Sequence, residues 1–155
     1  MNGIVAVVAN KVPNDCHETR CNKDGCRINL AGAPPMSVLI DMDCNALSIP
    51  ENWKRCDYLF VGEESNATWV APIELKSGRL SVSEVLEQLE GGARMANRWL
   101  PQGVSFQLAP VLAHGKTIHR NDLKVLRARK IQLRGQRRRT ALIKCGDQLT
   151  KALGA

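Results

Sequence analysis

The chain lacks an apolar run long enough to span a bilayer. Its opening residues also lack the basic segment and the long apolar core of a secretory signal. We therefore expect a cytoplasmic protein that does not associate with a membrane. Aromatic residues are scarce, at 4% of the 155 residues, but the hydrophobic content of 44% is typical of a globular protein. A chain of this length is most simply one domain with a core of its own.

Two signatures of enzyme classes are also missing. No glycine-rich loop of the phosphate-binding kind follows a predicted strand, which disfavours an NTPase or a dinucleotide-dependent enzyme. No serine or cysteine lies in a nucleophile motif, so nothing in the sequence supports Ser/His/Asp or Cys/His catalysis, without excluding it.

The charges, by contrast, are distributed unevenly. Residues 115–155 contain twelve Lys and Arg against two Asp, a net charge of +10, whereas residues 1–114 contain ten against thirteen acidic residues, a net charge of −3. An acidic part that can hold a metal thus precedes a basic part that can hold a polyanion. This asymmetry predicts a nucleic acid as the partner. The alternative is a solvated basic face that serves solubility.

Two predicted strands near the middle of the chain, Asp57–Val61 and Trp69–Lys76, contain the most informative side chains. Alternation along a strand places Glu74 and Lys76 on one face, and pairing of the two strands brings Asp57 near them. Two carboxylates beside a lysine suit a divalent cation and a phosphate, because carboxylate oxygens are the ligands that Mg²⁺ prefers. The alternative is an ordinary ion pair, with Asp57 capping its strand.

The order of these residues resembles the PD-(D/E)xK nuclease superfamily. The resemblance extends from Ser37 to about His114, and rests on Asp57, on Glu74-Leu75-Lys76 at the end of an apolar strand, and on the Gln88-Leu89 step in the following helix. It implies an α/β protein with a restriction-endonuclease-like mixed β-sheet flanked by helices. Residues 1–155 would form a single nuclease-like domain, with a cysteine-containing loop and first strand at residues 16–44 and a basic C-terminal extension at residues 115–155.

The resemblance also implies an activity. The protein would be a Mg²⁺-dependent (or Mn²⁺-dependent) endonuclease that hydrolyses phosphodiester bonds of DNA. Asp57 and Glu74 would hold the metal, together with the Leu75 carbonyl, Lys76 would assist the attacking water, and Gln88 would reach the active site. The alternative is a non-catalytic nucleic-acid-binding module on the same scaffold. The sequence leaves open whether two copies of the chain form a homodimer.

The sequence departs from the family pattern at three points. Cys56 stands where the motif has a proline, and no N-terminal helix with the family's frequent extra glutamate is evident. Pro72 lies inside the strand that should be central, where its missing N–H predicts a bulge.

Four of the six cysteines, Cys16, Cys21, Cys26 and Cys44, lie in or beside the polar segment 11–35. A reducing compartment argues against disulfides. The four thiols could bind one structural Zn²⁺, although their spacing is not the tight Cys-x2-Cys of a zinc knuckle. Free thiols are the alternative. A small metal-binding interaction protein organised by these cysteines is therefore a third functional hypothesis.

The second half of the chain continues the α/β pattern. The segment Ser81–Leu100 has a capping-box start and an apolar stripe at helical spacing, and it precedes a predicted strand at Val104–Ala113, so we expect a parallel βαβ unit. The pair Gly91-Gly92 predicts a close contact between this helix and the sheet. Lys130–Leu133 and Thr140–Ile143 are expected to form two strands around a turn. The arginines of this segment are predicted to bind phosphates: Arg134, Arg137, Arg138 and Arg139.

Overall fold

The computed structural model describes residues 3–154. The helices are α1 (Ile4–Lys11), α2 (Val82–Trp99), α3 (Arg120–Ala128) and α4 (Thr150–Leu153), with a 3-10 turn at Asn14–Cys16. The strands are β1 (His17–Glu18), β2 (Cys21–Lys23), β3 (Cys26–Ile28), β4 (Met36–Asp41), β5 (Tyr58–Glu64), β6 (Ala67–Lys76), β7 (Gln107–Leu108), β8 (Val111–His114), β9 (Ile131–Leu133), β10 (Gln136–Arg138) and β11 (Ala141–Lys144). The apolar run at residues 4–9 thus lies in helix α1.

The main sheet has seven strands in the order β1-β4-β5-β6-β8-β11, with β7 also pairing with β6. Its first half is antiparallel, whereas β6, β8 and β11 run parallel to one another. The expected mixed sheet flanked by helices is thus confirmed. No helix among residues 3–154 is both long and apolar enough to cross a membrane.

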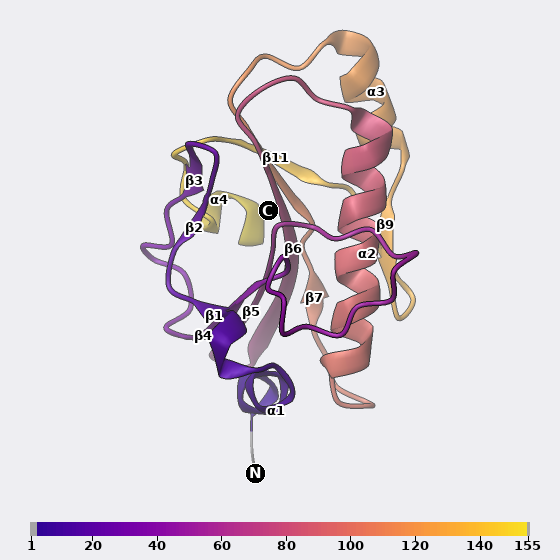
Figure 1. Ribbon diagram of the computed structural model, residues 1–155. Coiled ribbons are helices and arrows are strands. Elements are labelled where there is room, and N and C mark those ends of the chain that lie inside the picture. The colour runs from indigo at the N-terminus through magenta and orange to yellow at the C-terminus, as the bar shows by residue number, and fades with distance from the viewer. Residues whose placement is uncertain (1–2, 155) are drawn as a thin grey trace.

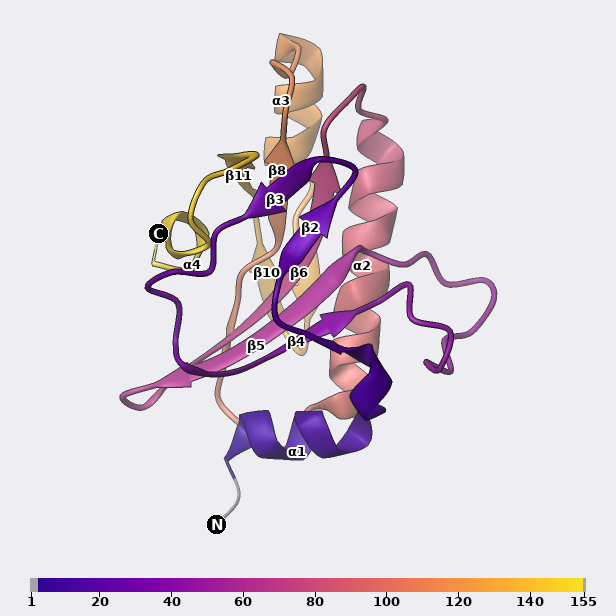
Figure 2. The ribbon, with the colours of Figure 1, turned by 60° about the vertical axis from the view of Figure 1, so that its left-hand side comes forward.

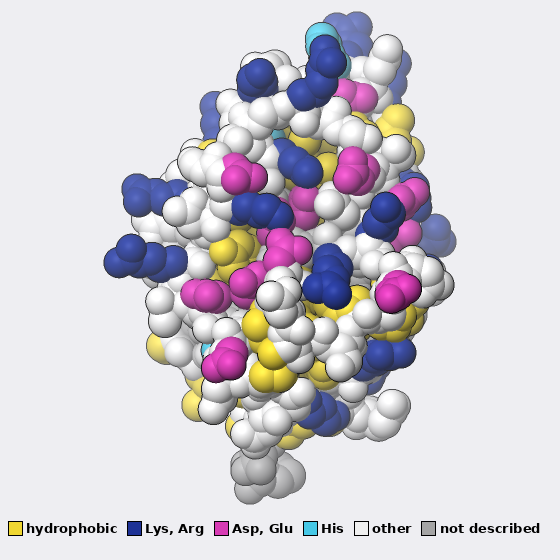
Figure 3. Space-filling model, in the orientation of Figure 1, with side chains coloured by type: hydrophobic (Ala, Val, Ile, Leu, Met, Phe, Trp, Pro, Cys, Tyr) yellow, Lys and Arg dark blue, Asp and Glu magenta, His cyan; other side chains and the backbone are white. Residues whose placement is uncertain are grey.

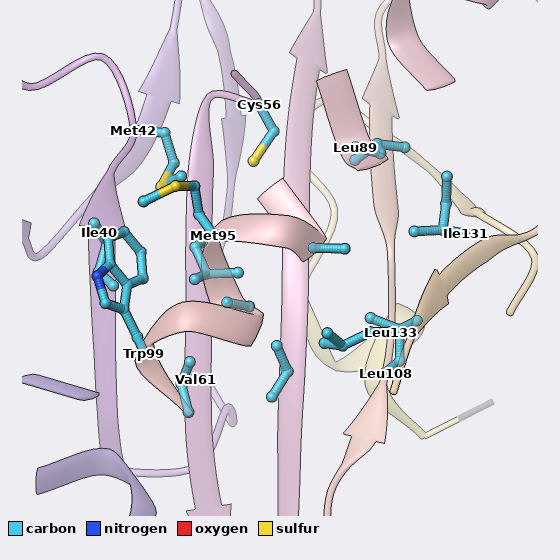
Figure 4. Close-up of a cluster of buried hydrophobic side chains, with 14 of the residues drawn as sticks. Ile40, Met42, Cys56, Val61, Leu89, Met95, Trp99, Leu108, Ile131 and Leu133 are labelled. Carbon is cyan, nitrogen blue, oxygen red and sulfur yellow. The ribbon is translucent and has the colours of Figure 1, made fainter. Parts of the chain in front are cut away.

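The sheet lies between two unlike layers (Figure 1). Helix α2 and the β9–β10 hairpin cover one face, while the β2–β3 hairpin and α4 cover the other, as the second view also shows (Figure 2). On the α2 side, large apolar side chains from the sheet and the helix fill the interior (Figure 4). The side chains labelled in that view are Ile40, Met42, Cys56, Val61, Leu89, Met95, Trp99, Leu108, Ile131 and Leu133.

Strands β5 and β6 form a long hairpin closed by Ser65 and Asn66. Both of these residues have positive φ, at 45° and 72°, which suits the two-residue turn that favours hairpins. The loop expected at residues 62–68 is therefore shorter than predicted, because both strands continue into it. The pairing extends without interruption from Glu64 opposite Ala67 to Tyr58 opposite Ile73.

The bulge expected at Pro72 does not form, since Pro72 pairs in register with Leu59. The reason lies on the other side of the strand. The Val70 carbonyl accepts a hydrogen bond from the Ala109 amide, so by alternation the nitrogen of Pro72 faces this side as well. There the neighbouring strand is interrupted between β7 and β8, at Ala109 and Pro110, and the sheet needs no donor from Pro72.

The parallel βαβ unit is confirmed, because β8 pairs in parallel with β6 after the intervening helix α2. The segment predicted as a basic extension contributes a strand to the same sheet, since β11 pairs in parallel with β8. The predicted partner of β9 was wrong: β9 pairs with β10, not with the strand at residues 141–144. Positive φ at Arg134 and Gly135, 46° and 83°, closes this hairpin early and frees β11 for the sheet.

The expected close contact at the two glycines of α2 is present. A Cβ atom at Gly91 would overlap the carbonyl oxygen of Lys54, and one at Gly92 would overlap the Cys56 sulfur and approach Pro72. The helix therefore lies directly against the segment that leads into β5. This contact fixes the backbone immediately before Asp57.

The cysteines are arranged differently from the prediction. Cys16 forms a disulfide with Cys44, and Cys26 forms one with Cys145, which is 119 residues away in sequence. The four proposed zinc ligands therefore do not meet at one point, and the expectation of reduced thiols is wrong for three of them. Of the four, Cys21 alone is free, and it is buried, as is Cys56. Spacing along the chain could not indicate the partner Cys145, because only tertiary folding brings it to Cys26.

Candidate active site

The predicted carboxylates meet at one end of the central hairpin. Asp57 directly precedes β5 and Glu74 lies near the end of β6, next to the last paired residues Tyr58 and Ile73. Both side chains are buried, with 4% of Asp57 and 1% of Glu74 exposed. The structure thus brings Asp57, Glu74 and Lys76 together, as the strand pattern predicted.

Backbone amides hold both carboxylates in place. The Leu75 amide donates to Oδ2 of Asp57 over 2.8 Å. The Asp57 amide donates to Oε1 of Glu74 over 3.0 Å and to the Ile73 carbonyl over 3.0 Å. Because the N–H and C=O groups of one strand residue point to the same side, the Leu75 carbonyl also faces Asp57. The oxygens at this end of the sheet are therefore fixed by the fold itself.

Lys76 lies beside the pair on β6. Its Nζ is 3.4 Å from Oε2 of Glu74, and its side chain is 30% exposed. The ammonium is thus close to a buried carboxylate and still reaches solvent. This is the position from which a lysine can contact a water molecule or a phosphate bound in front of Glu74.

A second lysine, Lys23, completes the cluster and was missed by the sequence analysis. Its Nζ donates to Oδ1 of Asp57 over 2.5 Å and to Oδ2 of Asp43 over 2.9 Å. Lys23 ends β2, and the turn that follows contains Asp24 and Gly25, both with positive φ. The Asp-Gly dipeptide is a hairpin signal that could have located this turn. Nothing local indicates that the hairpin folds back over a residue 34 positions away.

Gln88 lies on α2 at the level of Glu74. The contact between Gly92 and Pro72 fixes how α2 lies along β6. From this contact, Gln88 lies four residues back along the helix, a distance of about 6 Å. Glu74 lies two residues forward along the strand, about 6.6 Å in the same direction, because the strand runs opposite to the helix. The Oε1 atom of Gln88 is buried and has no hydrogen-bond partner in the part of the chain that is described. An unsatisfied buried oxygen at this place suits a ligand or water of the site.

Electrostatics distinguish Glu74 from an ordinary surface acid. Burial raises the pKa of the Glu74 carboxyl to about 8, the charge of Asp57 adds to the rise, and Lys76 opposes it. For Lys23, burial lowers the pKa of the ammonium, but its hydrogen bonds to Asp57 and Asp43 outweigh this and raise the pKa above its ordinary value. Burial and the charge of Asp57 thus both disfavour the ionised form of Glu74, and a bound cation would favour that form.

The raised pKa of Glu74 predicts a pH-dependent stability. Its ordinary value is 4.5, so the folded protein binds one more proton than the unfolded chain between about pH 4.5 and pH 8. The free energy of unfolding should therefore fall as pH rises through this window, by at most about 1.4 kcal/mol per pH unit. Glu74→Gln removes the ionisation and should flatten the profile. Urea unfolding of the unaltered protein and of Glu74→Gln in EDTA at several pH values measures the two profiles. The same slope with pH in both proteins would contradict the expectation.

The remaining predicted residues lie elsewhere. The Arg134 guanidinium donates to the carbonyls of Asn97, Leu100 and Pro101, so it caps the end of α2 and is not free for phosphate. Arg137, Arg138 and Arg139 are exposed. They precede β11, whereas Lys144 at the other end of that strand is in register, through His114, with Lys76. The three arginines therefore lie toward the opposite end of the sheet from the carboxylates.

The buried thiols are not candidates for a nucleophile. Burial raises the pKa of Cys21 to about 12, and the nearby charge of Asp57 adds to the rise. Burial likewise raises the pKa of Cys56 far above its ordinary value, with Glu74 adding to the effect. Both thiols therefore stay protonated at neutral pH, and a thiol is a poor nucleophile.

The donor set fits a magnesium ion rather than a soft metal. No group of three or more His, Cys, Asp or Glu side chains suitable for a metal ion occurs within residues 3–154. Mg²⁺, however, keeps several waters and needs only one or two carboxylates from the protein. Asp57 and Glu74 supply these, with the Leu75 carbonyl on the same side and the unsatisfied oxygen of Gln88 nearby.

Acidic side chains gather in the middle of one face of the molecule, with lysine and arginine side chains around them and further basic side chains toward α3 (Figure 3).

In comparisons with protein-family models, curated proteins and solved structures, no match to this chain was found.

Proposed function

We propose that the protein is a Mg²⁺-dependent nuclease that hydrolyses phosphodiester bonds of DNA, most simply an endonuclease on a restriction-endonuclease-like fold. The observation that supports this most is the buried Asp57–Glu74 pair, fixed by backbone amides, with Lys76 3.4 Å from Glu74. The topology agrees with the proposal, because an antiparallel β4-β5-β6 unit is followed by α2 and a parallel β8.

In this proposal Asp57 and Glu74, with the Leu75 carbonyl, would hold Mg²⁺ or Mn²⁺. When bound, the cation would stabilise the charge that develops on the phosphate. Lys76 would donate a hydrogen bond to the attacking water or to the scissile phosphate, and Gln88 Oε1 would accept one from the same water. Water adds to phosphorus as the bond to the leaving oxygen breaks; the water would lose a proton to solvent, and the leaving oxygen would take one from solvent. The burial of Glu74, which is 1% exposed, would keep other water away from this carboxylate.

A basic cavity beside the cluster suits the backbone of the substrate. It has a volume of about 240 Å³, and its lining includes Arg79, Lys116, His119 and one acidic residue, Asp122. It adjoins the end of β6, because the Gly115 amide, next to Lys116 of the cavity lining, donates to the Lys76 carbonyl. Phosphates neighbouring the scissile one would lie here. Arg137, Arg138 and Arg139 would contact the backbone further away, toward the other end of the sheet, and these contacts give affinity rather than sequence choice.

A second candidate function is a DNA-binding module that keeps the scaffold without catalysis. The contact of Lys23 with Asp57 favours it, because an ammonium already neutralises one proposed metal ligand. Both candidates would use residues 1–155 as one domain.

Cleavage of duplex, branched and single-stranded DNA separates the two candidates. With Mg²⁺ or Mn²⁺ the protein should cut at least one of these, EDTA should stop it, and Glu74→Gln should lower the rate at least about a hundredfold by removing a charged ligand. Glu64→Gln is the matched control, because Glu64 is an exposed carboxylate at the far end of the same hairpin. Cleavage that persists in folded Glu74→Gln would disprove the assignment of the active site to Glu74. DNA binding without any cutting would select the second candidate.

A further inference from the structure

The ammonium of Lys23 lies where the proposed cation would bind. Oδ2 of Asp57 already accepts the Leu75 amide, so Oδ1 is the oxygen left for another partner, and Lys23 contacts it over 2.5 Å. The same Nζ contacts Asp43 over 2.9 Å. Asp57 is almost fully buried, whereas the side chains of Lys23 and Asp43 are 42% and 52% exposed. The lysine thus closes the solvent side of a buried carboxylate.

The position of Lys23 is fixed by the hairpin that contains it. Cys21 and Ile28 are buried in the core on the β2–β3 side of the sheet. Cys26 is the direct partner of Lys23 across the hairpin and is joined by a disulfide to Cys145, next to the end of β11. The Tyr58 hydroxyl, from the first residue of β5, donates to the Asn22 carbonyl over 2.8 Å. The hairpin is therefore anchored on the sheet on both sides of the lysine.

We propose that Lys23 is a built-in counter-ion that competes with the divalent cation for Asp57, and so sets the cation concentration at which the site fills. The proposal rests on the function proposed above. Two positive charges cannot share Oδ1 at contact distance without strong repulsion, since the buried carboxylate is poorly screened. On cation binding, Lys23 leaves Asp57 and keeps Asp43, which is already within hydrogen-bond distance.

Binding of Mn²⁺ alone, measured by calorimetry and by electron paramagnetic resonance, tests the competition without any substrate. Lys23→Met keeps the aliphatic stem and removes the charge, so Mn²⁺ should bind about tenfold more tightly than to the unaltered protein. Arg27→Met is the matched control. It removes one positive charge from the same hairpin, where Arg27 pairs with Asn22 and has no contact with Asp57, and it should change affinity less than about twofold.

A second measurement needs no variant. In the unaltered protein, saturating Mg²⁺ should increase amide hydrogen exchange in residues 21–28 severalfold, because displacement of Lys23 removes one anchor of the hairpin. If Mn²⁺ binds the unaltered protein and Lys23→Met equally, or the variant more weakly, the competition is disproved while the nuclease proposal stands. If neither protein binds Mn²⁺, both proposals fail. Exchange that stays unchanged at saturating Mg²⁺ would also contradict displacement.

Discussion

Replacing Lys76 by methionine is expected to lower the rate of DNA cleavage about 100- to 1,000-fold, the range typical of removing one positioned hydrogen-bond donor. The expectation follows from the 3.4 Å contact of Nζ with Oε2 of Glu74 and from the partial exposure of the side chain. Methionine keeps an unbranched apolar side chain close to the length of the lysine stem and removes the charge and the donors. The variant should remain folded, because Lys76 ends β6 and is not part of the buried core.

The loss at Lys76 must be separated from a loss of metal. Lys76 lowers the pKa of Glu74, so its removal should raise that pKa further and weaken cation binding at neutral pH. Rates should therefore be measured at saturating Mg²⁺ over a range of alkaline pH, where Glu74 is ionised in both proteins. Lys144→Met is the matched control, because Lys144 is an exposed lysine two strands away in register with Lys76. Full activity of Lys76→Met under these conditions would remove the lysine from the mechanism.

Local patterns in the sequence predicted the part of the site that lies on one hairpin. Alternation along β6 placed Glu74 and Lys76 on one face, and the apolar runs on either side of a polar turn predicted the pairing that brings Asp57 to them. The βαβ unit followed from an amphipathic helix with a capping-box sequence between two strands. The hairpin depends on residues within about twenty positions of one another, and the βαβ unit on the periodicity within each of its elements; such local patterns are the ones that a single sequence expresses clearly.

The features that were missed depend on contacts between distant segments. Lys23 is 34 positions from Asp57, and Cys26 is 119 from Cys145, so no local period relates them. Arg134 was assigned to phosphate because arginines cluster there, but its left-handed backbone turns its guanidinium toward three carbonyls at the end of α2. Pro72 was expected to distort the sheet, and the break between β7 and β8 that accommodates it could not be placed from the sequence.

Gly91→Ala is expected to destabilise the fold by about 3 kcal/mol, although alanine is the better helix former by about 1 kcal/mol. The added Cβ would overlap the carbonyl oxygen of Lys54, which is backbone and not the movable end of a side chain. Relief therefore requires α2 and the segment before β5 to separate. For a chain of this size the midpoint of thermal unfolding should fall by about 10 °C, which calorimetry measures.

Gly91→Ala should also lower the activity, because the segment that the added Cβ displaces leads directly into Asp57. Gly78→Ala is the matched control: a Cβ at Gly78 would meet nothing within 4 Å, and stability should change by less than about 0.5 kcal/mol. In Gly91→Ala, cleavage measured well below the new midpoint should fall more than the small fraction of unfolded protein accounts for, since the amide of Asp57 holds Glu74. Unchanged stability of Gly91→Ala would mean that α2 does not touch the Lys54 backbone, and the support for Asp57 would have to come from its hydrogen bonds to β6 and to Met42.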